Sequence, residues 1–501
     1  MTSSPAVAAD IGQTRVWGPQ IAVLGGMQLL VVLDGTVAAL ALPRIQNALG
    51  LSDSGGAWII TAYVLAFGGL MLLGGRLGDA FGRKRMFVAG VAAFTVTSLL
   101  CGLAWDPISL IIGRALQGAS AAVAAPTAMA LVATTFAPGK PRNQAFAVYA
   151  AMTGIGSVAG LIAGGVLTEL SWRLVFLINV PIGLLVVLGA VMCLRESQGE
   201  RMSLDVKGAV LATLGCTLVV LAVNEGPGGW LRPVVVIPLV VGLASLIAFV
   251  FVERRAENPI LPFSLFANSS RVAALVAILL AGAIIMCMAV FISLYLQGIL
   301  EYSPIQSGMA VVPFAFGLGT AAAIASKLAL RYQPRWLVLF GGAVVVAGCA
   351  YAATIARDAP AYFPHIFVPV VVIGAGVGMA VIPLTLSVVA GVGPNEIGPL
   401  TALAQVAQNL GGAIALVAVG AMVTSRTLSE GGTTGPVDQM NASELDALAS
   451  GYGLAFVCCA LIAVAAGIVV LFMRFTPEDV AEGQAAQEVA QTSGEPGEWT
   501  A

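Results

Sequence analysis

The sequence predicts an all-α integral membrane protein with fourteen transmembrane helices, and three observations lead to this fold class. Of the 501 residues, 59% are hydrophobic and only 10% are charged, and the mean hydropathy is +0.97. Such a chain lacks the polar side chains that would cover a water-soluble protein of this size. Apolar runs of about 20 residues, the length that a helix needs to cross a bilayer, recur along the chain. Helices are favoured because each satisfies its own backbone hydrogen bonds in lipid.

The apolar runs divide the chain into fourteen predicted helices. Seven lie in the first half, at 18–42, 56–75, 86–104, 108–134, 145–168, 175–194 and 208–224. Seven follow, at 233–252, 272–296, 307–328, 336–355, 363–390, 398–423 and 451–473. An even number of spans places both termini on one side of the membrane.

Polar linkers group these helices into predicted units. The units are a cytoplasmic N-terminus (1–17), a six-helix bundle (18–194), an inserted two-helix hairpin (208–252), a second six-helix bundle (272–473) and a disordered cytoplasmic tail (474–501). The tail is acidic and rich in Gly and Gln, which is typical of disorder. The stretch GRLGDAFGRKR (75–85) is echoed by SKLALRYQPRW (326–336). This echo indicates two bundles related by a pseudo-two-fold axis, as in many secondary transporters.

The basic residues orient the chain in the membrane. Seventeen of the 23 Lys and Arg residues fall on the side of the N-terminus, five fall on the other side, and Arg114 lies within an apolar run. Lys and Arg concentrate in cytoplasmic loops. Arg outnumbers Lys nineteen to four, which is typical of a high-GC bacterial genome. We therefore expect a multi-pass protein of the bacterial cell (inner) membrane, with both termini in the cytoplasm.

Two charged residues, Asp34 and Arg114, are predicted to lie inside the membrane. At 1.5 Å per residue they sit roughly 12 and 9 Å from the outer ends of their helices, so their side chains could meet. A charge at the centre of a membrane helix costs at least about 2.5–3.5 kcal/mol, which makes it a candidate for function. One interpretation is proton coupling by the carboxyl group, and the other is a static ion pair that fixes packing. Gln117, one turn after Arg114, could bond to either state and is also a candidate for the substrate cavity.

Four stretches resemble a known family. The stretch at 75–85 resembles the cytoplasmic loop signature of the major facilitator superfamily, in which Gly, Asp, Gly and Arg recur at the positions of Gly75, Asp79, Gly82 and Arg83. LDGTVAALALPRI, GRALQGASAAVAAP and WRLVFLINVPIG are similar to the fourteen-helix drug:proton antiporter branch, of the EmrB/QacA type. The resemblance runs from about residue 18 to 473.

The resemblance implies roles for two groups of residues. Gly75, Asp79, Gly82 and Arg83 are expected to form a cytoplasmic latch between the two bundles, with Asp79 facing the N-terminus of the helix at 398–423. The alternative is that the basic loop only sets topology. The helix-five antiporter motif corresponds to Gly156, Gly160, Gly164 and Gly165, a face of small residues that permits close helix packing. Leu161 stands where the motif has proline, which puts strict exchange in question.

These features predict proton-gradient-driven export of small amphipathic compounds, as in multidrug or secondary-metabolite efflux. We expect a monomer whose partners are the substrate, protons and the lipid bilayer, with no nucleic acid. Walker, HExxH and GxSxG motifs are absent and the seven cysteines have no metal-binding spacing, so no enzyme activity, cofactor or metal is expected. A lipid or glycolipid exporter on the same fold is the alternative, and a membrane-embedded enzyme is less favoured. The second bundle has no acidic residue at the membrane centre, which favours neutral, monocationic or anionic substrates.

Overall fold

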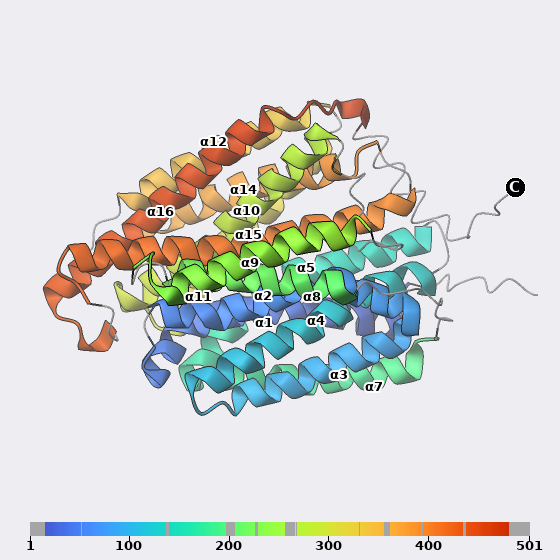
Figure 1. Ribbon diagram of the computed structural model, residues 1–501, viewed down its shortest axis with the longest axis horizontal. Helices are drawn as coiled ribbons and strands as arrows, with labels where there is room; N and C mark the ends of the chain where they lie inside the picture. Colours follow the sequence, from blue (N-terminus) through green and yellow to red (C-terminus); the bar gives the residue numbers. More distant parts are fainter. Residues whose placement is uncertain are drawn as a thin grey trace, which may run out of the picture.

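The structure, a computed structural model, describes most of the chain. The described ranges are 16–51, 53–136, 140–196, 206–225, 229–255, 266, 268–329, 331–354, 361–391, 394–433 and 437–479. Within these ranges the chain is helical and has no β-strand. The long helices run roughly along the longest axis of the molecule (Figure 1). The predicted units 1–17 and 474–501 lie almost entirely outside the described residues.

The first seven helices form one block, in the lower part of Figure 1. They are α1 (Pro19–Leu49), α2 (Asp53–Phe81), α3 (Arg83–Gly102), α4 (Pro107–Thr135), α5 (Lys140–Leu170), α6 (Leu174–Leu177) and α7 (Asn179–Cys193). Together α6 and α7 occupy one predicted span. The interruption lies just before Pro181, which has no N–H group to donate to the carbonyl of Leu177.

The last helices form a second block, most of which lies in the upper part of Figure 1. They are α10 (Ser269–Gly298), α11 (Pro304–Leu328), α12 (Pro334–Ala353), α13 (Tyr362–His365), α14 (Phe367–Val388), α15 (Pro394–Ser429) and α16 (Ala442–Val470), with a 3₁₀ turn at Val437–Gln439. Proline occupies the first turn of α1, α4, α11 and α12. At that position the helix needs no N–H donor, and the fixed φ of proline favours the start of a helix.

Helix contacts repeat between the two blocks. In the first block α1 packs on α5, α4 packs on α2 and α3, and α3 packs on α7. In the second block α10 packs on α15, α14 packs on α11 and α12, and α12 packs on α16. The blocks meet where α2 packs on α15, α5 on α11, and α1 on α10. Helices at corresponding places in the two blocks therefore have corresponding neighbours.

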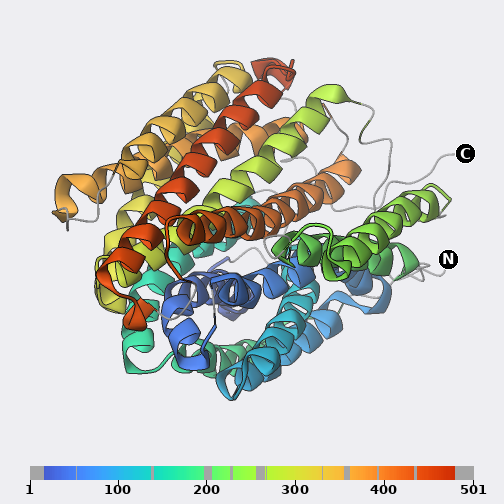
Figure 2. The same ribbon diagram turned by 60° about the vertical axis from the view of Figure 1, so that its left-hand side comes forward.

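The helices α8 (Val206–Glu225) and α9 (Pro233–Glu253) lie between the two blocks in the sequence and pack against each other. Helix α8 also contacts α2 and α15, one helix from each block, and Figure 2 shows the pair beside the seam between the blocks. Few residues of α9 are buried, and large apolar side chains such as Leu243, Ile247 and Phe251 lie exposed on its surface. Such a surface suits a helix that faces lipid tails.

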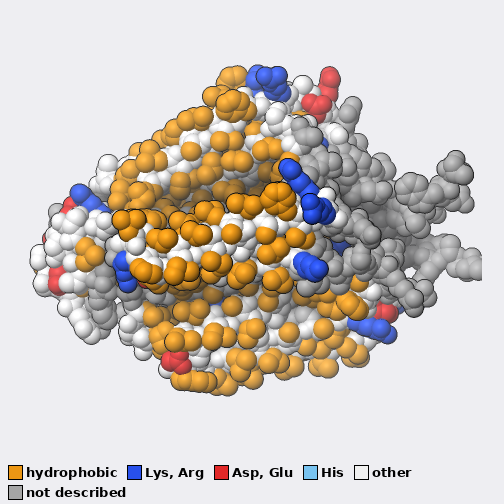
Figure 3. Space-filling model, in the orientation of Figure 1, with side chains coloured by type: hydrophobic (Ala, Val, Ile, Leu, Met, Phe, Trp, Pro, Cys, Tyr) orange, Lys and Arg blue, Asp and Glu red, His pale blue; other side chains and the backbone are white. Residues whose placement is uncertain are grey.

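Twelve helices in the described part of the chain are long and apolar enough to span a membrane. Helices α2 and α8 contain shorter apolar stretches, Gly55–Met71 and Val210–Ala222, so the predicted number of fourteen spans stays a prediction. Hydrophobic side chains cover the flank of the molecule, and charged side chains lie mainly toward its two ends (Figure 3). This distribution is that of a multi-pass membrane protein.

Several helix ends differ from the sequence prediction; α1 ends at Leu49 and α15 at Ser429, seven and six residues later than predicted. Helix α2 continues to Phe81, so Gly75 and Asp79 lie within a helix and the turn is confined to Gly82, where φ is +100°. Helix α16 begins at Ala442, nine residues earlier than the predicted start at 451. Its N-cap, Asn441, forms a capping box with Glu444, which extends the helix into the polar segment that precedes residue 451.

Candidate functional site

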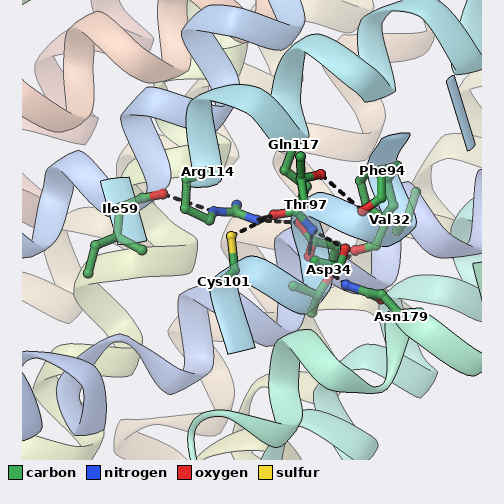
Figure 4. A network of polar contacts seen from close by, with 11 residues as sticks. Val32, Asp34, Ile59, Phe94, Thr97, Cys101, Arg114, Gln117 and Asn179 are labelled. Carbon is green, nitrogen blue, oxygen red and sulfur yellow. Dashed lines mark hydrogen bonds and ion pairs between the residues drawn. The ribbon is translucent and has the colours of Figure 1, made fainter. Parts of the chain in front are cut away.

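The structure brings Asp34 of α1 and Arg114 of α4 into direct contact (Figure 4). The Nη1 atom of Arg114 lies 2.6 Å from Oδ2 of Asp34. The side chains are 1% and 0% exposed, so water does not screen the pair. The two charges found by sequence reasoning thus form one buried ion pair.

Further contacts hold the guanidinium of Arg114 in place. Its Nε donates to the carbonyl oxygen of Ile59 in α2 at 3.0 Å, and Nη1 donates to Oε1 of Gln117 at 2.6 Å. The guanidinium also lies over the ring of Tyr63, 4.3 Å from the centroid. These contacts do not depend on the charge of Asp34, so the arginine keeps several partners when the carboxylate is neutralised.

Two amides bind the other oxygen of Asp34. Its Oδ1 accepts from Nε2 of Gln117 at 2.9 Å and from Nδ2 of Asn179 at 2.8 Å. Gln117 also donates to Oγ of Ser98 in α3 at 2.7 Å. The carboxylate of Asp34 therefore accepts hydrogen bonds from α4 and α7, in a network that also contains residues of α2 and α3.

Gln117 belongs to this network and has no exposed surface. Its amide bonds to both members of the ion pair. It reaches no exposed cavity in this conformation, and a role in substrate contact stays a prediction. Asn179 was missed by sequence reasoning. The available signal was a lone amide inside the apolar run LVFLINVPIGLLVV.

Local structure explains why the arginine reaches the aspartate. Helix α4 begins with a capping box in which Asp106 accepts from the backbone N–H groups of Ile108 and Ser109. Farther along α4, a Cβ atom at Gly118 would overlap the carbonyl oxygen of Tyr63 in α2. The absence of that atom lets α2 and α4 approach closely, which places Arg114 beside the backbone of α2.

The helix-five glycines line two different interfaces. Gly156, Gly160 and Gly164 face α1, where an added Cβ atom would lie within 3.2 Å of Val32, Thr36 and Val37. Gly165 faces the other block, with Ile305 Cα 2.7 Å from the position of a Cβ atom. One turn earlier, the carbonyl oxygen of Leu161 lies where a Cβ atom of Gly308 would be. Helix α5 is thus packed between α1, which carries Asp34, and α11 of the second block.

The predicted latch residues are only partly described. Gly82 forms the turn between α2 and α3. Gly75 lies within α2, and an added Cβ atom there would lie 3.6 Å from the Cβ atom of Pro126 in α4. The side chain of Asp79 and the side chains of residues 394–399 lie outside the described parts of the structure. The contact between them therefore stays a prediction, although α2 and α15 do pack against each other.

Neighbouring basic residues anchor the end of α7. Lys84 Nζ donates to the carbonyl oxygens of Val191 and Leu194 at 2.9 and 2.6 Å. Glu196 accepts from the backbone N–H of Lys84 and pairs with Arg85 at 3.5 Å. These contacts neutralise the carbonyl end of α7, a stabilising arrangement for a helix C-terminus.

The single carboxyl group of this buried network is bonded by Arg114 on one oxygen and by two amides on the other. In the described residues, no group of three or more His, Cys, Asp or Glu side chains could hold a metal ion.

Comparison with known families decides the class of protein. The sequence profile described as "Major Facilitator Superfamily" matches residues 24–416. The chain belongs to the major facilitator superfamily. This matched region of the chain contains most of α1, all of α2 to α14, the whole network around Asp34, and the first part of α15.

Curated relatives align over most of this major facilitator chain. The "Uncharacterized MFS-type transporter EfpA" of Mycobacterium tuberculosis is 51% identical over 468 residues, 93% of this chain and 88% of the relative. The "Puromycin resistance protein pur8" of Streptomyces alboniger is 40% identical over 91% of this chain and 90% of its own length. The "Cephamycin export protein CmcT" of Amycolatopsis lactamdurans is 39% identical over 90% of this chain and 92% of its own length.

Solved structures show the same fold. A bacterial homologue of the human lysosomal transporter Spinster, in an inward-facing and unoccupied conformation, superimposes with a TM-score of 0.69. The alignment covers 93% of this chain and 97% of the homologue at 16% identity. At that identity the likeness concerns the fold alone.

Proposed function

We propose that this chain exports small amphipathic compounds across a bacterial cell membrane, driven by the proton gradient. The observation that carries the proposal is the ion pair between Asp34 and Arg114, fully buried within a bundle of transporter fold. A carboxylate and a guanidinium are expensive to bury, so a pair at this place favours a working role over packing alone. The names of two relatives, a puromycin resistance protein and a cephamycin export protein, support export of antibiotic-like molecules.

The proposed cycle alternates access between the two sides of the membrane. When Asp34 takes up a proton from outside, it loses its charge and its attraction to Arg114 weakens. Arg114 keeps its bonds to the Ile59 carbonyl and to Gln117, so α1 can shift relative to α4 while the guanidinium still has two hydrogen-bond acceptors. Release of the proton to the cytoplasm restores the pair, and the substrate moves in the opposite direction.

Helix α5 provides a route from the proton site to the interface between the blocks. Its glycines Gly156, Gly160 and Gly164 pack on α1 beside Asp34, and Gly165 packs on α11. Gln297 of α10 also donates to the carbonyl oxygen of Leu40 in α1, at 2.8 Å. A displacement of α1 would therefore disturb both interblock contacts, because the intervening packing is too close to absorb it.

The proposed topology has fourteen spans, with α8 and α9 as an inserted hairpin and both termini in the cytoplasm. The surplus of Lys and Arg on the N-terminal side supports this orientation. We propose that the chain works as a monomer, because the alternating motion needs only the two blocks of one chain.

A susceptibility screen tests the function. Cells that overexpress the chain are exposed to a panel of antibiotics and dyes, with and without an uncoupler that collapses the proton gradient. The proposal expects higher tolerance to several apolar compounds, lost when the uncoupler is present. In a deletion strain, unchanged drug susceptibility together with an altered envelope lipid composition would instead support the lipid or glycolipid exporter.

A further inference from the structure

Asn179 is a fully buried amide that ordinary packing does not explain. It lies at the first turn of α7, where the surrounding sequence is apolar, and its side chain is 0% exposed. Leaving a buried polar group without a partner costs roughly 1–3 kcal/mol. An apolar residue would avoid that cost, so a buried amide at this position indicates a specific polar contact.

The amide of Asn179 is aimed at the proton site. Its Nδ2 donates to Oδ1 of Asp34 at 2.8 Å, whereas its Oδ1 is buried without a hydrogen-bond partner. Figure 4 shows Asn179 approaching the carboxylate from the side opposite to Arg114. The side chain thus presents one engaged donor and one unused acceptor to the same carboxyl group.

An amide with this geometry can serve both charge states of the carboxyl. A carboxylate only accepts hydrogen bonds, and the N–H of Asn179 satisfies it. A protonated carboxyl must also donate, and rotation of the amide by half a turn presents its oxygen for that bond. Gln117 cannot do the same without losing its other bonds, because both ends of its amide are engaged with Ser98 and Arg114.

We infer that Asn179 is a positioning residue of the proton site, which holds the Asp34 carboxyl in both its charged and its protonated form. This inference rests on the proposed proton coupling at Asp34. The titratable and charged groups that interact with Asp34 in the described structure are Arg114 of α4, Tyr63 of α2 and Cys101 of α3. Asn179 is the neutral contact on α7. Because it lies at the break between α6 and α7, a change in its bond to Asp34 on protonation would act on that break.

The same geometry sets the sign of the effect. A hydrogen bond to a charged group is roughly twice as strong as one between neutral groups, so on balance the amide favours the carboxylate. In Asn179→Leu, which removes donor and acceptor at similar volume, Asp34 should hold its proton to more alkaline pH. The expected displacement is about one pH unit, a tenfold change in proton affinity.

Infrared spectroscopy of the purified full-length chain tests the inference without any transport substrate. The absorption of the protonated carboxyl group that disappears in Asp34→Asn is followed as a function of pH. In Asn179→Leu its midpoint should move by about one unit to alkaline pH, the tenfold change in proton affinity given above. An unchanged midpoint in folded Asn179→Leu would reduce Asn179 to a packing residue and overturn the inference.

The matched control is Thr95→Val. The hydroxyl of Thr95 bonds to the carbonyl of Val91 in its own helix, and the residue packs on α7 at Gly183, one turn beyond Asn179. Thr95→Val disturbs the same contact between α3 and α7 without touching Asp34, so its midpoint should match the wild type. A displacement as large as that of Asn179→Leu would mean that general packing sets the midpoint, against the inference.

A second variant keeps the test valid if Asn179→Leu does not fold. Asn179→Asp has nearly the same shape and places a second carboxyl group beside Asp34. The two groups should titrate as a coupled pair in two steps, the second displaced to alkaline pH, because neighbouring like charges disfavour ionisation. Two independent titrations in this variant would contradict direct contact and the inference with it.

Transport separates this inference from the proposed function. Ethidium efflux from everted vesicles is measured across a pH series. In Asn179→Leu the pH profile should move in the same direction as the infrared midpoint, while KM for ethidium stays within about twofold, less than the effect of one hydrogen bond. An infrared displacement in a chain whose wild type shows no proton-driven efflux would leave the role of Asn179 intact and remove the proposed function. Proton-driven efflux in the wild type, with a pH profile and infrared midpoint that do not move in Asn179→Leu, would support the proposed function and overturn the role of Asn179.

Discussion

Asp34 and Arg114, eighty positions apart in the sequence, are joined by a 2.6 Å ion pair at the centre of the first helical block. Arg114 and Asp34 have different additional partners, so replacing one is not equivalent to replacing the other. Removal of Arg114 leaves a buried carboxylate without its cation. Removal of the charge on Asp34 leaves an arginine that still has the Ile59 carbonyl and Gln117.

Neutralising the carboxylate should abolish coupling without abolishing the fold. We expect Asp34→Asn to lose pH-gradient-driven efflux while substrate binding in detergent survives, because an amide keeps the shape but cannot carry the proton. Arg114→Ala should be worse, since it removes the cation and leaves the carboxyl in surroundings that favour its neutral form. Efflux is measured in vesicles and normalised to the amount of protein in the membrane.

The double variant Asp34→Asn with Arg114→Gln decides between coupling and static packing. A static pair predicts that the double variant recovers both abundance and efflux, because two amides can bond to each other. Coupling predicts a folded protein that transports no substrate against the pH gradient. Recovery to near wild-type efflux would end the coupling role of Asp34.

The contact between α5 and α11 should control closure between the blocks. Gly308→Val would place side-chain atoms against the carbonyl oxygen of Leu161, and such overpacking costs about 1–3 kcal/mol. That energy shifts a two-state equilibrium by about tenfold or more, so we expect efflux to fall to about a tenth. The buried residue Leu40, replaced by cysteine, should at the same time become reachable by an impermeant maleimide from outside.

Gly319→Val in the same helix is the control for that experiment. No atom lies within 4 Å of a Cβ atom at Gly319, so the substitution adds the same bulk without a clash. Efflux and labelling should stay near those of the parent chain. Equal losses in both variants would show that α11 simply tolerates no valine, and would remove the argument for the contact.

Substrate charge provides a prediction that concerns the second block. No acidic residue lies near the membrane centre of α10 to α16, and a dication in an apolar cavity needs such a partner. Ethidium, a monocation, should therefore be exported at least about tenfold faster than propidium, its dicationic analogue, as expected for one unpaired buried charge. Similar rates for the two dyes would indicate acidic groups in the cavity that these helices do not supply.

Lys84 should stabilise the protein through the end of α7. Its ammonium donates to two backbone carbonyls, so Lys84→Met should lower the free energy of unfolding by about 1–2 kcal/mol. Arg85→Met should have a much smaller effect, because the side chain of Arg85 is 78% exposed and its pair with Glu196 is solvated. Thermal unfolding in detergent compares them, and equal midpoints would contradict the prediction.

The predicted latch is tested at Asp79. We expect Asp79→Asn to leave abundance nearly normal and to reduce efflux, because it weakens a contact with a helix N-terminus by about 1–2 kcal/mol. Cross-linking between residues 75–85 and the start of α15 should fall in that variant. Normal efflux with altered abundance would leave these residues a purely topological role.

The sequence by itself determined the class of fold and identified the two charges that the structure pairs, Asp34 and Arg114. Apolar runs, their length and the basic residues between them are local properties, and the bilayer converts them into helices because unpaired backbone groups are not tolerated in lipid. Asp34 and Arg114 stood out for the same reason, since a charge in such a run needs an explanation. Helix ends were less predictable. The extension of α2 to Phe81 and the early start of α16 lie in polar segments, where the hydrophobic pattern that marks a membrane helix is absent.

Only the tertiary structure decided which groups share the site. Asn179 looked like one polar residue in an apolar helix, and its meaning depends on the rotation of α7 relative to α1, which side-chain packing sets. The glycines of α5 formed a single small-residue face in the sequence, yet three of them face α1 and Gly165 faces α11. Periodicity tells which residues share a helix face, whereas the neighbour that each face meets is fixed by the close packing of all the helices together.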